Sequence, residues 1–328
     1  MKAAIMVPGA TGGAWDVRDV QRPVVGPGQV LVRVHASSIN RAEFRRLHTL
    51  RLEPGKPAPE ARPGGGDAAG EIVEIGAGVT GVKEGDRVMG RCAGGFAEFA
   101  LLDAREVMPA PQLLSWAEAA SVPVVFVVVH DGLFASSQLH KGETLLVTAA
   151  PSGVGTAALV LGKFIGARVI GTSRSADKLE KLKAHGLDVA VVIGVDGMAK
   201  AVQAAAGPAG VDMVVDNIGA DALAPCMDAL NVGGRLCTIG RMSGVHSAEM
   251  NIDRLAEKRL HLYGVSNRRR NAAQRAESAK RFMADLFPAL GDGRIKPIVD
   301  RAFPLDNIAA AQAYVEADRH VGKVVVTM

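Results

Sequence analysis

Disulfide frameworks and membrane spans both have little support in this sequence. Cysteine occurs three times, at Cys92, Cys226 and Cys237, and no two of these positions are close together. This spacing argues against a disulfide framework and predicts a reducing, cytoplasmic environment. The most apolar run, 122–129, is short and contains Pro123, so we expect a buried segment rather than a membrane span. A cationic, apolar and cleavable leader is not expected at the start of the chain.

No charge sign and no repeat dominates the composition. The 328 residues include 38 Lys and Arg against 34 Asp and Glu, for a formal net charge of +4. The cations are dispersed apart from an arginine triplet at 268–270, which could touch a phosphate but is not the basic stripe of a nucleic-acid-binding protein. Hydrophobic residues make up 48% and charged residues 22%, which is an ordinary globular balance, and the length fits two domains.

The clearest motif that is present is a strand, a tight turn and a helix between residues 143 and 165. Apolar and β-branched residues at 145–148 stop at a small-residue turn, and helical spacing starts at once. Small residues let the backbone approach a pyrophosphate, and the N–H groups and dipole of a new helix favour its negative charge. The turn therefore predicts a dinucleotide site, with candidate residues Ala150, Ser152, Gly153, Val154 and Gly155. A tight turn without a ligand is the alternative interpretation.

The choice of cofactor depends on the next strand, at 167–175. About 20 residues after the turn, a dinucleotide fold presents the group that meets the adenine ribose, and NAD-specific sites have Asp or Glu there. This chain has Ser173 and Arg174, with Lys178 one turn into the following helix. A hydroxyl and two cations would bind a 2′-phosphate that a carboxylate would repel, so we expect NADPH. The alternative interpretation of the two cations is a solvated helix start.

Two hydrophobic patterns divide the chain. Short β-like runs between Gly and Pro turns predict a partly open β-barrel in the N-terminal third; the runs are 1–7, 29–37, 70–75, 86–90 and 97–102. The Gly- and Pro-rich stretch 53–66 is expected to be a loop. From Ser115 onwards, apolar strands alternate with helices, which predicts an α/β fold with a doubly wound parallel sheet. We expect an amphipathic helix at 272–290 and a final strand at 321–328.

Several motifs occur in the order known from one protein family, namely 34–43, 66–70, 84–88, 152–156, 211–219, 233–236 and 322–325. On these motifs the chain resembles the zinc-free branch of the medium-chain dehydrogenase/reductase superfamily, the quinone oxidoreductases, along essentially its whole length. The tumour-suppressor-inducible quinone oxidoreductases look closest. The resemblance implies a Rossmann NADP(H)-binding domain at 123–266 and a GroES-like, partly open β-barrel catalytic domain at 1–122 and 267–328. It also implies an active cleft between the domains and a homodimer.

Residues that could bind zinc are scarce. Zinc-dependent relatives carry a Cys around Asn40, a His-Glu pair at the position of Gly66 and Asp67, and a four-Cys structural loop after the barrel strands. The loop 90–97 of this chain contains only Cys92. Tetrahedral zinc needs three or four thiolate, imidazole or carboxylate ligands, so we predict no metal. Asp67 is the ligand-type side chain that is left, and its simpler interpretation is a carboxylate bonded to backbone N–H groups.

The predicted chemistry follows from this lack of zinc ligands. Without a Lewis acid to polarise a carbonyl, alcohol oxidation is not expected, whereas quinones and activated enones accept hydride unaided. The resemblance implies that Asn40 lies beside the nicotinamide ribose and the substrate. It further implies that the cofactor-binding residues include Asn217, Gly240, Lys323 and the backbone of Val265, Ser266 and Asn267.

The proton donor for the reduced product is harder to identify. Many relatives have a tyrosine shortly after the Asn-containing motif, but this chain has only Tyr263 and Tyr314, neither in that region. His48 lies near the vacant position and could donate a proton at neutral pH. The alternative is a solvated histidine on a loop, with water as the proton source. Glu43, where relatives commonly carry Asp, is expected to be a structural anchor.

Other polar residues have structural interpretations. His130 and Asp131 follow the buried run at 122–129, and we expect them to satisfy each other or nearby backbone groups. His35 is expected to be a barrel residue for the same reason.

The sequence thus predicts an NADPH:quinone oxidoreductase that transfers hydride to a quinone or a related conjugated carbonyl. Two alternatives stay open. The first is an enoyl or 2-alkenal double-bond reductase, including one with a role in a biosynthetic pathway. The second is an NADPH-binding structural or RNA-binding protein with little turnover, in which the arginines at 268–270 would contact RNA.

Overall fold

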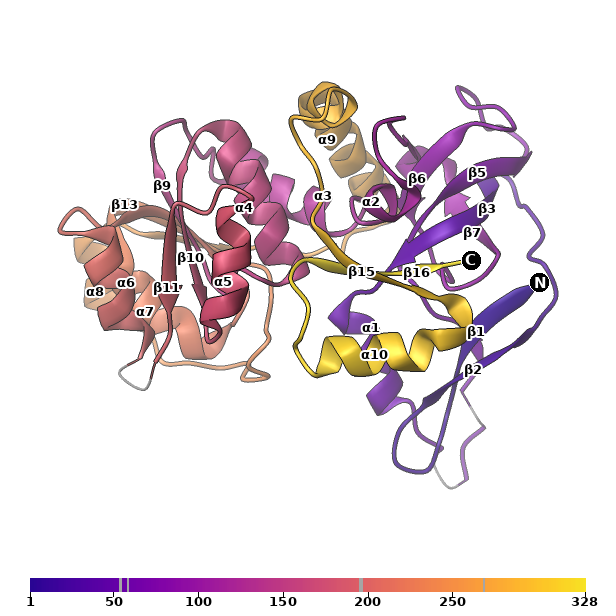
Figure 1. Cartoon of the computed structure of the whole chain (residues 1–328), viewed down its shortest axis with the longest axis horizontal. Helices are drawn as coiled ribbons and strands as arrows, with labels where there is room; N and C mark the ends of the chain where they lie inside the picture. The colour runs from indigo at the N-terminus through magenta and orange to yellow at the C-terminus, as the bar shows by residue number, and fades with distance from the viewer. Residues whose placement is uncertain (53–54, 58, 195–196, 268) are drawn as a thin grey trace. The chain divides into compact units, whose positions relative to one another are not determined.

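The computed structural model describes residues 1–52, 55–57, 59–194, 197–267 and 269–328. This part of the chain forms two compact units (Figure 1). The first unit contains Met1–Val124 and Ala273–Met328, and the second contains Val125–Ala272. Both ends of the chain therefore belong to the first unit, where indigo and yellow segments lie side by side.

Two β-sheets form the body of the first unit. The larger sheet has the strand order β15-β16-β3-β5-β6-β8, and β7 also pairs with β3. Its strands are β3 (Gln29–Ser38), β5 (Asp67–Ile75), β6 (Arg87–Arg91), β7 (Phe99–Asp103), β8 (Met108–Pro109), β15 (Val299–Pro304) and β16 (Lys323–Thr327). The smaller sheet has the order β2-β1-β4, from β1 (Lys2–Val7), β2 (Ala14–Asp19) and β4 (Arg62–Pro63). This separate, mainly antiparallel unit confirms the β part of the predicted fold class.

The strand β3 joins the two ends of the chain. Val30, Leu31 and Val32 are completely buried, and such branched side chains favour a long strand with apolar neighbours. The first half of β3 pairs with β7, and its last residues pair with β16, where Ser38 lies opposite Val325. This pairing places the first residue of β16 close to the residues that follow β3.

In the described part of the first unit, the sheets are accompanied by α-helices and short 3₁₀ helices, namely α1 (Arg41–Thr49), α2 (Trp116–Ala120), α9 (Ala272–Gly291), α10 (Ile308–Glu316), η1 (Ala104–Glu106) and η4 (Leu305–Asn307). At the start of α1, the carboxylate of Glu43 accepts the backbone N–H of Asn40 at 3.0 Å. At the start of α2, Glu118 accepts the backbone N–H of Ser115 in the same way at 2.8 Å. Both helices therefore begin with a capping box.

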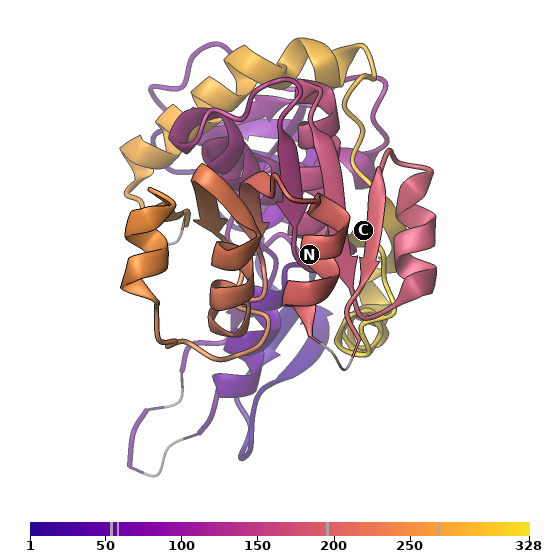
Figure 2. The same cartoon turned by 90° about the vertical axis from the view of Figure 1, so that its left-hand side faces the viewer.

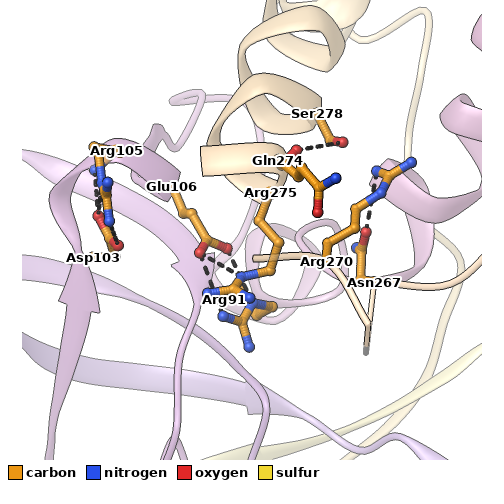
Figure 3. A network of polar contacts seen from close by, with 9 residues as sticks. All are labelled: Arg91, Asp103, Arg105, Glu106, Asn267, Arg270, Gln274, Arg275 and Ser278. Atoms are coloured by element: carbon orange, nitrogen blue, oxygen red, sulfur yellow. Dashed lines mark hydrogen bonds and ion pairs between the residues drawn. The ribbon is translucent and has the colours of Figure 1, made fainter. Parts of the chain in front are cut away.

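Within the first unit, a buried carboxylate connects α9 to the β-strands (Figure 3). Glu106, only 5% exposed, accepts Nε of Arg91 at 3.0 Å and Nε of Arg275 at 2.8 Å. Arg91 ends β6 and Arg275 lies in the first turns of α9. A carboxylate buried to this extent needs cations or hydrogen-bond donors around it, so the pair of arginines stabilises the contact between helix and sheet.

A parallel sheet forms the centre of the second unit. Its order is β11-β10-β9-β12-β13-β14, from β9 (Thr144–Val147), β10 (Arg168–Ser173), β11 (Val189–Val192), β12 (Val211–Asp216), β13 (Leu230–Thr238) and β14 (His261–Gly264). The chain enters at a central strand, winds outwards in one direction, and then returns to wind in the other. This order confirms the predicted doubly wound α/β sheet.

Helices cover both faces of this sheet (Figure 1, Figure 2). They are α3 (Val125–His130), the π-helix η2 (Asp131–Ser136), α4 (Gly153–Ile165), α5 (Ala176–Lys183), α6 (Met198–Ala206), η3 (Ala220–Ala222), α7 (Leu223–Ala229) and α8 (Ile252–Glu257). Leu146 and Ile170 join the buried cluster with α6 and α7, while the alternate residue Leu145 contacts α4 at Gly162. Strands that are buried on both faces have nearly continuous apolar sequences, and the strands of this sheet follow that pattern.

Three details of the first unit differ from the sequence-based expectations. The stretch 53–66 was expected to be a loop, but Arg62–Pro63 pairs with β1 as the short strand β4; residues 53, 54 and 58 lie outside the described part. The strand β2 was not predicted, because Trp15, Asp16 and Arg18 mix polar and apolar side chains. His48 was expected on a loop, but it lies in the last turn of α1.

The buried ion pairs of Glu106 give a test of how α9 is held. Because Arg91 and Arg275 are themselves partly exposed, we expect Glu106→Gln to lower the free energy of unfolding by about 2 kcal/mol. Denaturant unfolding followed by circular dichroism measures the change. Asp103→Asn is the control, since this neighbouring carboxylate pairs with the exposed Arg105 and its loss should leave stability nearly unchanged. An equal effect of both substitutions would contradict the assignment.

Candidate functional site

The carboxyl ends of β9 and β12 form the point in the second unit where the strand order reverses. β9 pairs with β10 on one side and with β12 on the other, and all three strands are parallel. Connections leave in opposite directions at such a point, so a crevice opens beyond the strand ends, and ligands of doubly wound sheets bind there. The predicted dinucleotide turn follows β9, and Asn217 follows β12.

The turn after β9 is shaped for close backbone approach. Ala149 has φ of 47°, in the left-handed region, and Ala150 is completely buried. Ser152 caps α4, because its hydroxyl accepts the N–H of Gly155 at 3.0 Å. A Cβ on Gly155 would lie 2.6 Å from the carbonyl oxygens of Ala149 and Ala150, so only glycine lets helix and strand pack this closely.

The helix α4 therefore presents its first N–H groups at the end of β9. The N–H groups of the first helical turn have no partner within the helix, and the dipole adds a partial positive charge. Gly153 and Val154 are the first two residues of α4. This arrangement fits a pyrophosphate, and the structure brings together all five residues that the sequence predicted for the turn.

The ribose end of the predicted site lies at the carboxyl end of β10. Ser173 is the last residue of this strand, and its hydroxyl accepts the N–H of Ser175 at 3.1 Å. The exposed Arg174 follows, and Lys178 is half-buried in the first turn of α5. A hydroxyl and two cations are thus placed along one short stretch, next to the strand that precedes the turn.

Asn217 and Gly240 lie where β12 and β13 end. Asn217 donates its side-chain Nδ2 to the carbonyl of Thr148 at 2.9 Å, and among the described residues its buried Oδ1 has no hydrogen-bond partner. A Cβ on Gly240 would lie 2.5 Å from the carbonyl oxygen of Asn217, so the two strand ends are in close contact. A buried carboxamide oxygen without a donor is a feature that a bound ligand could satisfy.

The segment Val265–Asn267 continues β14 at the same edge of the sheet. The N–H of Val265 donates to the carbonyl of Thr238 at 3.1 Å, and Arg270 donates Nη1 to Oδ1 of Asn267 at 3.4 Å (Figure 3). Arg270 also forms an ion pair with Asp131, which is 2% exposed. The segment after β14 is therefore anchored to η2.

This ion pair corrects two sequence-based interpretations. Asp131 was expected to be satisfied by His130 or by backbone groups, but its carboxylate pairs with Arg270, and the ring of His130 stacks on Phe134. Arg270 was grouped in an arginine triplet that could contact RNA, yet it neutralises a buried carboxylate in its own unit. Arg268 of the same triplet lies outside the described residues.

In the first unit, the side chain of Asn40 is held on both sides of its amide. Its Nδ2 donates to Oδ2 of Asp67 at 2.8 Å, and its Oδ1 accepts Nζ of Lys323 at 2.9 Å. Lys323 also donates to the carbonyl of Ile39 at 2.9 Å. These contacts fix which way the amide points and leave it one further N–H donor.

The carboxylate of Asp67 is at the centre of this polar cluster. It is 1% exposed, and besides Asn40 it accepts the hydroxyl of Ser38 at 2.6 Å. Its partners include these two side chains as well as the backbone of Val124, whereas we had expected backbone N–H groups alone. Burial raises the pKa of Asp67, while Lys323, Ser38 and Asn40 lower it. Ser38 is a member of the cluster that the sequence analysis missed. It ends β3 two residues before Asn40, whose backbone is also extended, and both side chains bond to Asp67.

Two further ionisable groups contact the cluster. Burial raises the pKa of Glu43 to about 7, against the lowering effect of the Asn40 N–H, and the nearby Asp67 raises it further. Burial lowers the pKa of the Lys323 ammonium, while Asp67 and Glu43 raise it. Lys323 is 3% exposed, so its charge is balanced by these carboxyls rather than by water.

The residues present do not form a zinc site. Cys92 is buried, and burial together with the charges of Asp67 and Glu43 raises the pKa of its thiol far above the usual range. Thiolate is the form that binds zinc. In the described part of the chain, no group of three or more His, Cys, Asp and Glu side chains could hold a metal ion. The cation within this cluster is the ammonium of Lys323.

His48 does not join the Asn40 cluster. It lies eight residues along α1, and because a helix rises about 1.5 Å per residue, it is roughly 12 Å from Asn40 along the axis. Its Nε2 contacts Oε1 of Glu316 on α10 at 2.7 Å, and its side chain is 58% exposed. The structure therefore brings Asn40 and Lys323 together and leaves His48 apart from them.

Gly155 allows a direct test of the turn. We expect Gly155→Ala to weaken binding of the reduced nicotinamide dinucleotide by about tenfold or more, because its Cβ would push α4 away from β9. Titration of cofactor fluorescence measures the dissociation constant. Gly194→Ala is the matched control, since a Cβ there meets nothing within 4 Å. Unchanged affinity in Gly155→Ala would contradict the role given to this turn.

Two family models match the chain. The model described as "Alcohol dehydrogenase GroES-like domain" matches residues 26–112, and the one described as "Zinc-binding dehydrogenase" matches residues 186–326. The first match lies in the β unit, and the second covers most of the parallel sheet and the C-terminal segment.

Curated relatives match over nearly the whole chain. Quinone oxidoreductase from Rattus norvegicus is 29% identical over 318 residues, which cover 95% of this chain and 93% of the relative. The synaptic vesicle membrane protein VAT-1 homolog from Rattus norvegicus is 30% identical over 338 residues, covering 95% and 81%. Polyketide synthase GfsB from Streptomyces halstedii is 33% identical over 302 residues, 92% of this chain, but the chain spans only 5% of that synthase.

Solved structures agree with these matches. A mycobacterial quinone oxidoreductase has a TM-score of 0.86 at 26% identity, and a mycobacterial protein in complex with NADPH has a TM-score of 0.86 at 25% identity, each over 100% of both chains. JamJ enoyl reductase, at 23% identity over 99% of both chains and a TM-score of 0.85, shares the fold. The chain therefore belongs to the zinc-free quinone oxidoreductase family of the medium-chain dehydrogenase/reductase superfamily, whose fold binds a pyridine nucleotide.

Proposed function

We propose that this protein is a zinc-independent, NADPH-dependent reductase that transfers hydride to a quinone or a related conjugated carbonyl. The observation that carries the proposal is the amide of Asn40, which is held between the ammonium of Lys323 and the carboxylate of Asp67. This cluster offers oriented hydrogen-bond donors and a positive charge. It suits an acceptor that needs orientation rather than a Lewis acid.

The residues around the turn would hold the cofactor. The first N–H groups of α4 suit the pyrophosphate, and Gly155 lets the backbone come close. The anchored segment Val265–Asn267 and the buried Oδ1 of Asn217 would meet the carboxamide. The bound nicotinamide supplies the hydride, and the protein orients the acceptor and excludes water.

The proposed preference for NADPH over NADH is supported by the residues at the end of β10. Ser173 and the cations of Arg174 and Lys178 can bind a phosphate through charge-assisted hydrogen bonds, whereas an NAD-specific site places a carboxylate on the ribose hydroxyl. These same side chains would give NADH no comparable interaction.

Asn40 would be the residue that meets the acceptor. The amide keeps one N–H beyond its bond to Asp67, and Lys323 keeps its positive charge close to the same point. As hydride adds to a quinone or enone, negative charge develops on the acceptor oxygen, and a fixed donor with a nearby cation stabilises that charge.

A double-bond reductase for enoyl or alkenal substrates is the second candidate. It is favoured by the match to a polyketide synthase over 92% of this chain and by the fold shared with an enoyl reductase. The same cluster would stabilise the enolate that forms when hydride adds to a β-carbon. The two candidates differ in the acceptor that turns over faster, not in the cofactor.

A substrate panel tests the proposed function. We expect loss of NADPH absorbance to be faster with quinones than with enones or enals, and slower with NADH than with NADPH for every acceptor. A chelator should change nothing, because no step needs a metal. Faster turnover of enones would favour the double-bond reductase, and no oxidation of bound NADPH by any acceptor would contradict both candidates.

The control for cofactor choice is a double substitution at the phosphate end. Arg174→Ala with Lys178→Ala should weaken NADPH binding about ten- to a hundredfold, the cost of losing charge-assisted hydrogen bonds, and leave NADH binding unchanged. Equal losses for both cofactors would mean that these cations do not meet the 2′-phosphate.

We also propose that the protein is a cytoplasmic homodimer. In the described part of the chain, no helix is both long enough and apolar enough to cross a bilayer.

The dimer is suggested by an edge of the parallel sheet. β14 is an edge strand of this sheet, and Val232 and Ile252 of the same unit are 69% and 60% exposed. An open strand edge, in a unit that also exposes apolar side chains, favours pairing with a second copy. Sedimentation equilibrium should give twice the chain mass, and a monomer at micromolar concentration would contradict the dimer.

A further inference from the structure

Three ionisable groups meet in one place of the first unit, where Asp67 and Lys323 are buried and Glu43 is half-buried. Glu43 comes from the first turn of α1, Asp67 from the start of β5, and Lys323 from the start of β16. Asn40 contacts all three, through its backbone N–H, its Nδ2 and its Oδ1 respectively. Two carboxyls face one ammonium, so the cluster would carry an uncompensated negative charge if both carboxyls were ionised.

The hydrogen bonds of the two carboxyls are unequal. Asp67 accepts two side-chain donors on Oδ2, from Ser38 at 2.6 Å and from Asn40 at 2.8 Å. Glu43 accepts the backbone N–H of Asn40 on Oε2 at 3.0 Å, and the backbone of Gly66 also lowers its pKa. Donors stabilise the ionised form of a carboxyl, so a single proton shared by the pair resides mainly on Glu43.

Each carboxyl also has a buried oxygen without a hydrogen-bond partner among the described residues, namely Oε1 of Glu43 and Oδ1 of Asp67. An ionised oxygen in this condition is costly, and protonation of one carboxyl removes that cost. A Cβ on Gly66 would lie 3.2 Å from Oε1 of Glu43, so Gly66 lies close to this oxygen, and its backbone lowers the pKa of Glu43.

Among the described residues, Lys323 is the cation that acts on both Asp67 and Glu43. The thiol of Cys92 also lies close to Asp67 and Glu43. Burial raises the pKa of this thiol, so it stays uncharged. Burial also raises the pKa of Glu43 to about 7. Glu43 is half-buried as a residue, and its Oε1 is inaccessible to solvent.

We propose that Glu43 is a proton store: it keeps a proton at neutral pH and releases it for the reduction. This inference rests on the proposed function. The hydride adds to the acceptor with its electron pair, and the acceptor oxygen becomes an anion. The O–H bond of Glu43 then breaks, an O–H bond forms on that oxygen, and the carboxylate left behind takes a new proton from water. Glu43 replaces His48 as the candidate proton source.

The store can be measured without cofactor or substrate. Infrared difference spectra between wild type and Glu43→Gln should show, at pH 6, the C=O stretch of a protonated carboxyl that disappears as the pH rises through about 7. Glu118→Gln is the matched control: it removes a carboxylate at the same helical position in α2, whose pKa is lowered by its donors Ser115 and Lys296. No such band should be lost in the control. A spectrum without a Glu43 band at pH 6 would overturn the proposal.

A second measurement starts from the wild-type chain, in case the substitution impairs folding. A folded carboxyl with a raised pKa binds a proton that the unfolded chain has released, so stability falls as the pH rises from 4.5 to about 7 and then levels off. Wild-type denaturant midpoints across this range should follow that course, and midpoints that do not fall would overturn the proposal. Where Glu43→Gln folds, its slope should be smaller. The same slope in both proteins would place the stored proton elsewhere and overturn the assignment to Glu43.

Turnover shows whether the stored proton serves the reaction. If Glu43 must be protonated, kcat should fall about tenfold between pH 6 and pH 8, as for a single acid of pKa about 7. In Glu43→Gln this dependence should be lost, while KM for NADPH stays unchanged. An identical pH profile in both proteins would overturn the catalytic role. The infrared result stands whether or not quinones are the substrate, so failure of the store and failure of the proposed function can be told apart.

Discussion

The candidate site of the first unit depends on one buried carboxylate, that of Asp67. A charge that is 1% exposed needs donors and a compensating cation, because water cannot solvate it. Ser38, Asn40 and Lys323 fill these roles, and they come from the end of β3, the residue before α1 and the start of β16. The final strand is therefore part of the site. When the chain returns to the first unit, it completes the sheet and also supplies the cation of the cluster, Lys323.

The second unit meets a different requirement, close approach of backbone to an anionic ligand. Doubly wound topology places the ends of β9 and β12 beside each other, and the turn after β9 uses Gly155 where any Cβ would collide with two carbonyl oxygens. Geometry of this kind supplies N–H groups and a dipole without any charged side chain. The two units thus contribute complementary chemistry: one favours a nucleotide, and the other has an oriented amide beside an ammonium.

The sequence predicted elements well where the signal was local and regular. The helix α9 ends within one residue of the predicted bounds, since its amphipathic pattern is long and regular. Prediction was wrong where tertiary contacts outweighed local pattern. β2 is a strand because it pairs along its full length with β1, and Arg62–Pro63 pairs with β1 although its own stretch is rich in Gly and Pro. Asp131 and Arg270 are 139 positions apart, so no local pattern could have paired them.

By itself, the sequence determined the α/β fold class, the small-residue turn after β9 and the Ser-Arg pair at the end of β10, because these depend on neighbouring residues and on periodicity. It also placed Glu43 three residues after Asn40, the spacing of a capping box. Only the tertiary structure decided that Asp67 and Lys323, 27 and 283 positions from Asn40, share that place with Glu43. Strand pairing brings such distant residues together, and their burial in one cluster changes the protonation of groups that would each be ordinary on an exposed surface.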